Sequence, residues 1–396
     1  MTLADTPTST CTDTPLGFAL SEEQALIQES VRELAQKEFA PKAAEIDRNH
    51  RFPRENWELL GATDLTGLYF SEKYGGAGLD HVCYAIAVEE LAKACPTTSV
   101  LYSAHVSLTA APIDFFGTEE QKEKFLVPMC KGEKLGAFCL SEPNSGSDSA
   151  AATCMAELKG DHFILNGSKN WITNGVEADI YLVIAQTDKS LKHKGLVALL
   201  VEKGSPGFTF GKLEDKLGIR GSSTCQTIFE DTPVPVANML GKVGDGFKVA
   251  MVTLDGGRIG IAAQAVGIAQ GALDHAVKYA HERTAFNKKV IEFQAIKHMI
   301  ADMQTQIDAA RLLTWHASVA QDKGIKFSRE AAHAKLYAAE VAMSATVKCV
   351  QIFGGYGYVT DYPAERYMRD AKITEIYEGT SEIQRLVIAS SLLKGT

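Results

Sequence analysis

A carboxylate, Glu378, stands between Tyr377 and Gly379 in the stretch IYEGTSEIQR, residues 376–385 of this 396-residue chain. Ser381 and Gln384 fit the S-x-x-Q capping box that begins a helix. The apolar face of that helix would consist of Ile383, Leu386 and Val387. Glu378 would then lie in the turn before the helix. It is either a solvated loop acid, which is the commoner case, or a base directed into a cleft, and these ten residues leave both interpretations open.

Two stretches in the middle of the chain carry residue types that suit a ligand. LGAFCLSEPNSGSDSAA (135–151) has a strand-like start and then a loop of Gly, Ser and Asn, whose hydroxyl and N–H groups suit a phosphate or a ring edge. The same composition also makes any tight turn, and it lacks the lysine of a P-loop and the glycine spacing of a dinucleotide fingerprint. SKNWITNG places Trp171 on a strand, where tryptophan belongs to the core more often than to a cofactor platform.

Two later stretches combine glycines with charged or aromatic residues. LDGGRIGIAAQ puts Asp255 and Arg258 at an expected helix start, where an Asp usually caps the helix. The Arg would bind either an anionic ligand or a neighbouring carboxylate. In QIFGGYGYVTDYPAERYMRD, the glycines 354, 355 and 357 allow a ligand to approach the backbone, or simply a sharp reversal of the chain.

Three segments must position these residues. From Ser21, which forms a capping box with Gln24, helical periodicity continues to about Cys130. Between about Lys134 and Lys242 the pattern predicts strands, and the two Asn-Gly dipeptides of DHFILNGSKNWITNG predict a hairpin. Further strands are predicted at DIYLVIAQTD, GLVALLVEK, GFTFGKL and CQTIFEDTPVP. After GKVGDGF helices resume, so the predicted order is helical, then β, then helical.

Two apolar stripes mark the long helices of the last segment. The first consists of Ile259, Ala262, Val266, Ala269, Leu273 and Val277. The second consists of Leu336, Ala339, Met343, Val347 and Val350, and ends at the Gly354-Gly355 stop. Each stripe belongs either to the core or to a bundle surface buried against another subunit.

The composition is that of a soluble globular protein with two or three domains, because 45% of residues are hydrophobic and 22% are charged. A net charge of −9 without a basic run argues against nucleic acid, and no apolar run approaches a membrane span. Eight cysteines without a C-x-x-C pair and ten dispersed histidines favour a reducing compartment and no metal site. The start, MTLADTPTSTCTDTPLG, matches neither a secretory signal nor a transit peptide, and we expect a short flexible tail.

In combination, these motifs resemble the acyl-CoA dehydrogenases, flavoproteins of fatty-acid and amino-acid catabolism. The resemblance runs from about Phe18 to the C-terminus through LSEPNSGSD, WITNG, DGGRIGIAAQAVGIAQGALD and QIFGGYGYVTDYPAERYMRDAKITEIYEGTSEIQR, and the last two are most similar to the short-chain (butyryl-CoA) branch. It implies an α+β fold assembled as a homotetramer. The implied parts are a tail (1–17), an N-terminal α-helical domain (18–133), a middle β-barrel or sandwich domain (134–243) and a C-terminal four-helix bundle (244–396).

The resemblance also implies the reaction, FAD-dependent α,β-dehydrogenation of a short-chain acyl-CoA to the trans-2-enoyl-CoA. Glu378 is then the base that removes the α-proton while a hydride passes from the β-carbon to flavin N5. The charge on the thioester oxygen would be stabilised by the backbone N–H of Glu378 and by a ribityl hydroxyl of FAD. An apolar cleft would raise the pKa of this base, and Gly379 would let the chain pass close to the thioester. Some family members carry the base at the position of Gly257, which has no side chain here.

Further roles are implied for residues that match the family's motifs. The flavin wall would consist of Phe138, Leu140, Ser141, Trp171, Ile172 and Thr173, with the Ser141 hydroxyl near N5. The FAD adenosine pyrophosphate would meet Arg283 and Gln294, and FAD of a neighbouring subunit would meet Gln351, Gly354 and Gly355. The helix start Thr380, Ser381 and Glu382 would face the FAD diphosphate. Ser147 would contact CoA, and Asp255 and Arg258 would hold its adenine end.

The implied electron acceptor is electron-transfer flavoprotein, and the expected location is a bacterial cytoplasm or, as a processed form, the mitochondrial matrix. The alternative is a dehydrogenase, or an enoyl-CoA reductase run backwards, for a branched, dicarboxylic, alicyclic or aromatic acyl-CoA. Tyr102 and His105, in a segment expected to line the acyl pocket, either fit an unusual acyl tail or pack normally. Glu378 disfavours a non-catalytic scaffold, and the chain length disfavours an acyl-CoA oxidase with its additional domain.

Overall fold

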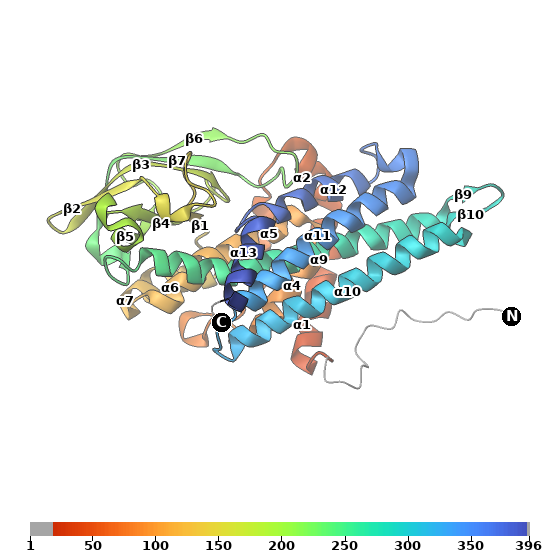
Figure 1. Cartoon of the computed structure of the whole chain (residues 1–396), viewed down its shortest axis with the longest axis horizontal. Helices are drawn as coiled ribbons and strands as arrows, with labels where there is room; N and C mark the ends of the chain where they lie inside the picture. The colour runs from red at the N-terminus through yellow and green to blue at the C-terminus, as the bar shows by residue number, and fades with distance from the viewer. Residues whose placement is uncertain (1–18, 394–396) are drawn as a thin grey trace.

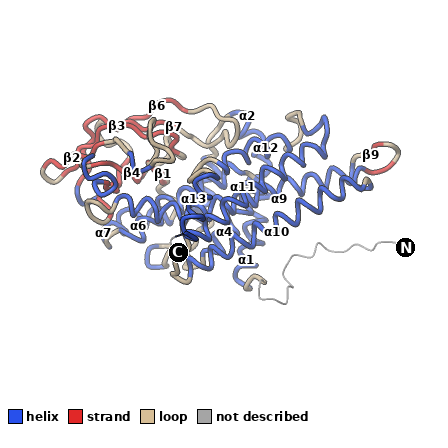
Figure 2. Tube along the Cα trace, in the orientation of Figure 1, coloured by secondary structure: helices blue, strands red, loops and turns tan. Residues whose placement is uncertain are grey.

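The computed structural model describes residues 19–393, so the expected tail at 1–17 lies outside the described residues. Helices occupy both ends of this range, and the strands of a sheet lie between them in sequence. Most of the strands gather in one part of the molecule, beside the helices (Figure 2). In space the sheet sits at one end of the molecule, and the long C-terminal helices run away from it toward the β9–β10 hairpin (Figure 1). The α+β class expected from the sequence is confirmed.

The N-terminal segment consists of short helices around two buried ones. They are α1 (Glu22–Leu34), α2 (Ala43–Asn49), α3 (Arg54–Ala62), α4 (His81–Ala94), α5 (Pro96–His105), α6 (Ala111–Phe116), α7 (Glu119–Gln121) and α8 (Val127–Cys130). The capping box at Ser21 is confirmed, because Ser21 Oγ accepts from the Gln24 N–H at 3.1 Å and the Gln24 side chain accepts from the Ser21 N–H at 3.0 Å. A π-helical turn, η5 (Val106–Ala110), joins α5 to α6, and such turns often occur at functional sites.

The middle segment forms one sheet in the order β6-β7-β3-β2-β4-β5-β8, with β1 pairing in parallel with β4. Its strands are β1 (Gly136–Cys139), β2 (Met155–Lys159), β3 (His162–Ile172), β4 (Ile180–Gln186), β5 (Leu196–Glu202), β6 (Phe208–Leu213), β7 (Cys225–Pro235) and β8 (Met239–Leu240). β4 is buried along its whole length and β5 along all but its last residue. Their continuous apolar runs are those of strands covered on both faces.

The hairpin predicted from the Asn-Gly dipeptides is wrong in its position. Lys159 pairs with His162, so the β2–β3 hairpin turns at Gly160–Asp161. Asn166–Gly167 lies inside β3 at an irregularity in the pairing with β7. Gly167 has φ of 141°, and a Cβ there would lie 2.8 Å from Cys154 Cα, so this glycine serves close backbone approach in a bulge.

The C-terminal segment consists of the long helices α9 (Gly246–Glu282), α10 (Gln294–Asp322) and α11 (Ser328–Phe353), followed by α12 (Ala364–Lys372) and α13 (Ser381–Leu393). The strands β9 (Thr284–Ala285) and β10 (Lys288–Lys289) connect α9 to α10. Asp255 and Arg258 lie well inside α9, so their predicted position at a helix start, and the capping role for Asp255, are wrong. α11 ends at Phe353 with Gly354 at φ of 62°, as its glycine stop predicts.

The two apolar stripes differ in burial. The first, on α9, is buried except for the half-buried Val277. On α11 only Ala339 of the second stripe is buried, and Val347 is 49% exposed. The buried face of α11 is instead formed largely by alanines, which let it approach α9 closely; they include Ala334, Ala338, Ala342 and Ala345. The core interpretation of the second stripe is therefore only partly confirmed: Ala339 is buried and Met343 and Val350 pack against the core, whereas Val347 faces outward.

Among residues 19–393, one helical stretch satisfies the length and composition of a membrane span. Ser328–Gly357 has a window of mean hydropathy 1.2, so the expectation that no apolar run approaches such a span is too strict. Half of that window is buried inside the protein, and α11 packs against α9 and α10. These are the properties of a bundle's core helix.

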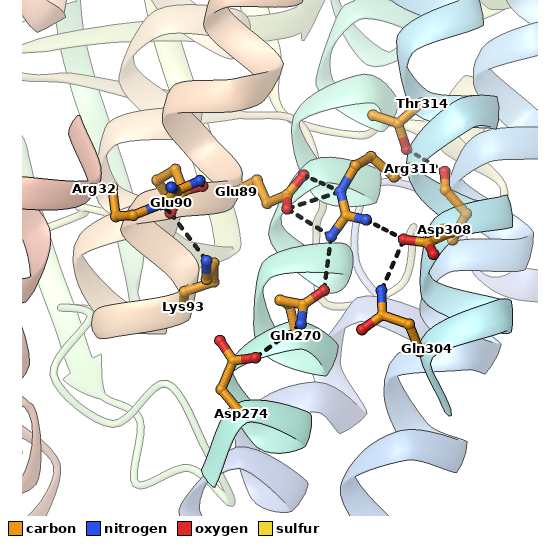
Figure 3. A network of polar contacts seen from close by, with 11 residues as sticks. Arg32, Glu89, Glu90, Lys93, Gln270, Asp274, Gln304, Asp308, Arg311 and Thr314 are labelled. Atoms are coloured by element: carbon orange, nitrogen blue, oxygen red, sulfur yellow. Dashed lines mark hydrogen bonds and ion pairs between the residues drawn. The ribbon is translucent and has the colours of Figure 1, made fainter. Parts of the chain in front are cut away.

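A buried arginine joins the two helical segments. Arg311 of α10 donates to Glu89 of α4 at 3.0 Å, to Gln270 of α9 at 2.9 Å and to Asp308 at 2.6 Å (Figure 3). Glu89 is only 4% exposed, so its charge depends on this partner. The network therefore fixes α4 against the long helices.

We expect Arg311→Leu to lower the free energy of unfolding by about 3–5 kcal/mol, because it leaves the buried Glu89 carboxylate without its partner. Urea denaturation followed by circular dichroism measures this. Lys159→Ala is the matched control, since its partner Glu157 is exposed and such pairs contribute less than about 1 kcal/mol. Equal effects of the two substitutions would contradict the role of Arg311.

Candidate active site

Glu378 lies in the turn before α13 and adopts φ of 53°, a left-handed conformation that is uncommon for a residue with a side chain. The residue as a whole is half-buried, and its carboxylate oxygen Oε2 is buried. Within residues 19–393, no donor bonds to that oxygen. A buried carboxylate without partners is unfavourable for stability, which is typical of a group retained for chemistry.

The Glu378 carboxylate rests against the glycine face of α9. A Cβ at Gly257 would lie 1.9 Å from Glu378 Oε2 and 2.7 Å from Leu108 Cδ2, so only glycine fits between them. A Cβ built at the neighbouring Gly256 would enter open space, since its nearest atom would be Gln321 Nε2 at 3.8 Å. Leu108 comes from the π-helical turn η5, which brings the N-terminal segment to the carboxylate.

Burial dominates the proton affinity of this carboxylate. It raises the pKa of Glu378 to about 8, against the opposing effects of Lys335 and Arg258. A general base works best when its pKa lies near the working pH, so this shift favours proton abstraction.

The start of α13 differs from the predicted capping box. Thr380 caps the helix, with its Oγ1 accepting from the Ile383 N–H at 3.3 Å. Ser381 is the first helical residue, and its buried Oγ has no partner in the described part of the chain. Gln384 Nε2 instead donates to the carbonyl oxygens of Gly379 at 2.8 Å and of Glu378 at 3.3 Å. The Ser381–Gln384 box is therefore wrong, and Gln384 holds the turn that carries the carboxylate.

Asp255 and Arg258 form a buried ion pair on α9 at 2.6 Å, and Asp255 also accepts from Ser328. A Cβ built at Gly379 would lie 3.8 Å from Arg258 Nη2, so the guanidinium is beside the Glu378 turn. The roles of Asp255 and Arg258 at the adenine end of CoA stay predictions.

Trp171 and Thr173 line a cavity of about 350 Å³ at the end of β3. Its wall also includes Lys216, Ile219, Ile376 and Tyr377. Trp171 is 58% exposed, so the interpretation of it as a core residue is wrong. Ile172 does not line this cavity, since it is 2% exposed and packs in the core, and its place in the flavin wall stays a prediction.

Ser141 lies next to this cavity's edge, because its carbonyl oxygen accepts from the N–H of Asn170 at 2.8 Å. A buried ion pair fixes the same loop: Lys169 Nζ donates to Glu142 at 2.7 Å and to the Leu140 carbonyl at 3.1 Å. The structure thus brings Ser141, Trp171 and Thr173 together. Phe138 and Leu140 are half-buried against the core, and Ser147 is exposed farther along the loop.

A second group of expected residues lies elsewhere. Arg283, Gln294, Gln351, Gly354 and Gly355 are exposed, and none of them lines the cavity of Trp171. Arg283 is over the Tyr356 ring, 5.4 Å from its centre. These residues belong to the region of the β9–β10 hairpin and the end of α11, away from the sheet (Figure 1). Glu382 is exposed in the first turn of α13.

Tyr102 and His105 pack normally. Tyr102 is fully buried and donates to the Leu65 carbonyl at 3.1 Å. His105 Nδ1 accepts from the Gly136 N–H at 3.0 Å, so Nε2 donates to the Met129 carbonyl at 3.1 Å. Burial lowers the pKa of His105 to about 3, which keeps the ring neutral. Neither residue is available for an unusual acyl tail.

Sequence reasoning missed Lys335 and Tyr84. Lys335 is 0% exposed and donates to the Gly379 carbonyl at 2.7 Å. A lysine within the alanine face of α11 was a visible signal, since a charge on an apolar face requires a partner. Tyr84 Oη is hydrogen-bonded to Ser103 Oγ at 2.9 Å, and a Cβ at Gly260 would lie 2.5 Å from Tyr84 Oη. No local pattern marks Tyr84, because its neighbours come from α5 and α9.

Three family models match this chain in succession. They are the acyl-CoA dehydrogenase N-terminal domain at residues 21–133, the middle domain at 137–232 and the C-terminal domain at 244–393. The short-chain specific acyl-CoA dehydrogenase of Clostridium acetobutylicum is 54% identical over 379 residues, which cover 96% of this chain and 100% of that protein.

Solved structures agree with these matches. Butyryl-CoA dehydrogenase from Megasphaera elsdenii has a TM-score of 0.94 and 49% identity, covering 96% of this chain and 100% of that one. A chain from a structure described as the electron transferring flavoprotein of Acidaminococcus fermentans, in work on flavin-based electron bifurcation, has a TM-score of 0.95 and 53% identity, with coverage of 96% and 100%. The chain therefore belongs to the acyl-CoA dehydrogenase family.

Proposed function

We propose that this enzyme dehydrogenates a short-chain acyl-CoA to the trans-2-enoyl-CoA with FAD as cofactor, and that Glu378 removes the α-proton. The observation that carries the proposal is the buried Oε2 of Glu378, which receives no hydrogen bond within the described residues and lies against Gly257. Such an oxygen is free to accept a proton from a thioester bound beside α9. Its raised pKa, about 8, strengthens it as a base.

The same turn can stabilise the charge that develops on the thioester oxygen. In the described part of the chain, the backbone N–H of Glu378 donates to no other protein group. A preorganised N–H directed at a developing oxyanion is an effective catalytic contact in a water-poor site.

The cavity of Trp171 fits a flavin. Its volume of about 350 Å³ lies within the range of ligand sites, and its indole, aliphatic and Thr173 hydroxyl lining suits an aromatic cofactor. The unpartnered Ser381 hydroxyl at the N-terminus of α13 suits an anion, since helix N-termini favour negative charge. FAD, when bound, supplies the acceptor for the hydride. Trp171, Thr173 and Ser141 would hold its ring system beside the turn of Glu378.

The geometry of α9 supports a short and uncharged acyl chain. One turn beyond Gly257, a Cβ at Gly260 would lie 2.3 Å from Ser103 Oγ and 2.5 Å from Tyr84 Oη, so α4 and α5 close directly on α9. The side chains that close on this stretch are Tyr84, Ser103 and Leu108, which offer no cation for a second carboxylate. The short-chain specificity named for the Clostridium relative agrees with this.

The remaining expectations form part of the same proposal. We propose the domain division 18–133, 134–243 and 244–396, and a homotetramer. Arg283, Gln294 and the end of α11 would reach the FAD of a neighbouring subunit, which is supported by their exposure away from their own chain's cavity and by the outward-facing Val347. Electron-transfer flavoprotein as acceptor is supported by the subject of the Acidaminococcus structure. A bacterial cytoplasmic location is supported by the Clostridium relative.

The purified protein should be yellow, and anaerobic butyryl-CoA should bleach its flavin faster than longer, branched, dicarboxylic or aromatic thioesters. Stopped-flow absorbance measures the rate for each thioester. Glu378→Gln should bind flavin and lose about 10⁴-fold or more of the rate, because an amide cannot take the α-proton. Bleaching only by an aromatic or dicarboxylic thioester would keep the base and overturn the short-chain substrate.

We expect Gly257→Ala to lower the rate of flavin reduction by about 100-fold, because the new Cβ must displace the Glu378 carboxylate. Gly256→Ala is the matched control, since its Cβ enters open space on the same helix. The melting temperature of both variants is measured alongside, because the new Cβ at 257 overpacks its site and the rates are compared only between folded proteins. Equal rates in both variants would contradict the placement of the carboxylate.

A further inference from the structure

Lys335 is a fully buried lysine beside the Glu378 turn. It is 0% exposed, and its ammonium donates to the Gly379 carbonyl at 2.7 Å. In the part of the chain that the structure describes, it forms no ion pair with a carboxylate. Burying an ammonium with a single neutral partner is costly. Since α11 otherwise presents mainly alanines here, the charge is better explained by its effect on the turn than by packing.

The turn that Lys335 contacts is strained. Glu378 and Gly379 are consecutive left-handed residues, at φ of 53° and 93°. Gln384 Nε2 donates to the carbonyls of both residues, and Lys335 provides a second donor to Gly379. Three hydrogen bonds from two helices thus hold the backbone that directs the carboxylate toward Gly257.

We infer that Lys335 is a positioning residue for Glu378, which clamps the turn through the Gly379 carbonyl and supplies the positive charge that favours the ionised base. This inference rests on the proposed role of Glu378. The other cation near the base, Arg258, is already neutralised by Asp255 at 2.6 Å. Lys335 is therefore the cation beside Glu378 whose positive charge is not neutralised by an ion pair.

Charged groups from α9, α13 and the Glu378 turn act on Lys335. Arg258 lies on α9, Glu378 in the turn, Glu375 just before the turn and Glu382 on α13. Burial is the largest effect and lowers the pKa of Lys335 to about 8. Because Lys335 lowers the pKa of Glu378, loss of its charge must raise that pKa further.

The test compares Lys335→Met, Lys335→Gln and Lys335→Arg with Gln384→Leu in the flavin-loaded protein. The readout is the pH profile of anaerobic flavin reduction by butyryl-CoA. The rate falls on the acidic side of this profile as Glu378 becomes protonated, and we call this fall the acid limb. Removal of the charge in the first two variants should move the midpoint of the acid limb up by about one pH unit or more, and lower the rate near neutral pH by about tenfold. In Lys335→Arg the midpoint should be that of the wild type. Gln384→Leu should lower the rate without moving the limb, because it loosens the turn and keeps the charge.

A second readout does not depend on catalysis. The folded pKa of Glu378, about 8, lies above its ordinary value of 4.5, so its contribution to stability is present below that ordinary value and is lost as pH rises toward 8. The difference in melting temperature between the protein and its Glu378→Gln variant should follow this course. In a Lys335→Met or Lys335→Gln background, the loss should continue to higher pH.

The outcomes separate the inference from the proposed function. If the acid limb and the melting curves of both uncharged variants match those of the wild type, the role of Lys335 is overturned. If no thioester bleaches the flavin, but the melting difference shifts with the charge at position 335, the inference is supported and only the proposed function fails. Should Lys335→Met not fold, Lys335→Gln and Lys335→Arg carry the same comparison.

Discussion

The contact between a buried carboxylate and a glycine helix face constrains the rest of this structure. Glu378 Oε2 reaches α9 only because residue 257 has no Cβ, and a buried oxygen without a donor is tolerated only where the surrounding structure holds it. The turn must therefore be left-handed and clamped from α11 and α13. α11 must come close enough for Lys335 to reach Gly379, which its alanine face allows.

Segments that are far apart in the sequence surround the Glu378 carboxylate and the adjoining cavity. Leu108 and Tyr84 come from the N-terminal helices, Trp171 from the end of β3, and Gly257 and Lys335 from the C-terminal helices. Their relative positions depend on the packing of α4 against α9 and α10. The hydrogen bonds of Arg311 to Glu89 and Gln270 stabilise that packing (Figure 3). A displaced α4 would move the walls of the acyl site together with the core. Stability and chemistry are thus linked by the same helices.

Local patterns in the sequence predicted what depends on local contacts. The order helical, β, helical, the capping box at Ser21 and the glycine stop of α11 are confirmed, because each depends on neighbours within a few residues. The same S-x-x-Q pattern failed at Ser381, where Gln384 finds better acceptors in the carbonyls of Glu378 and Gly379. The Asn166–Gly167 signal failed because Cys154 on the neighbouring strand approaches that glycine. Trp171 and Val347 of α11 were misjudged because exposure depends on the tertiary arrangement and not on residue type.

Removal of the α-proton by the Glu378 carboxylate is the step on which the proposed reaction depends. The exchange of the α-hydrogens of butyryl-CoA in D₂O, under anaerobic conditions without an added electron acceptor, measures this step by mass spectrometry. We expect deuterium at a single α-position with the native protein and none above the uncatalysed background with Glu378→Gln. Exchange in the variant at the native rate would show that another group removes the proton.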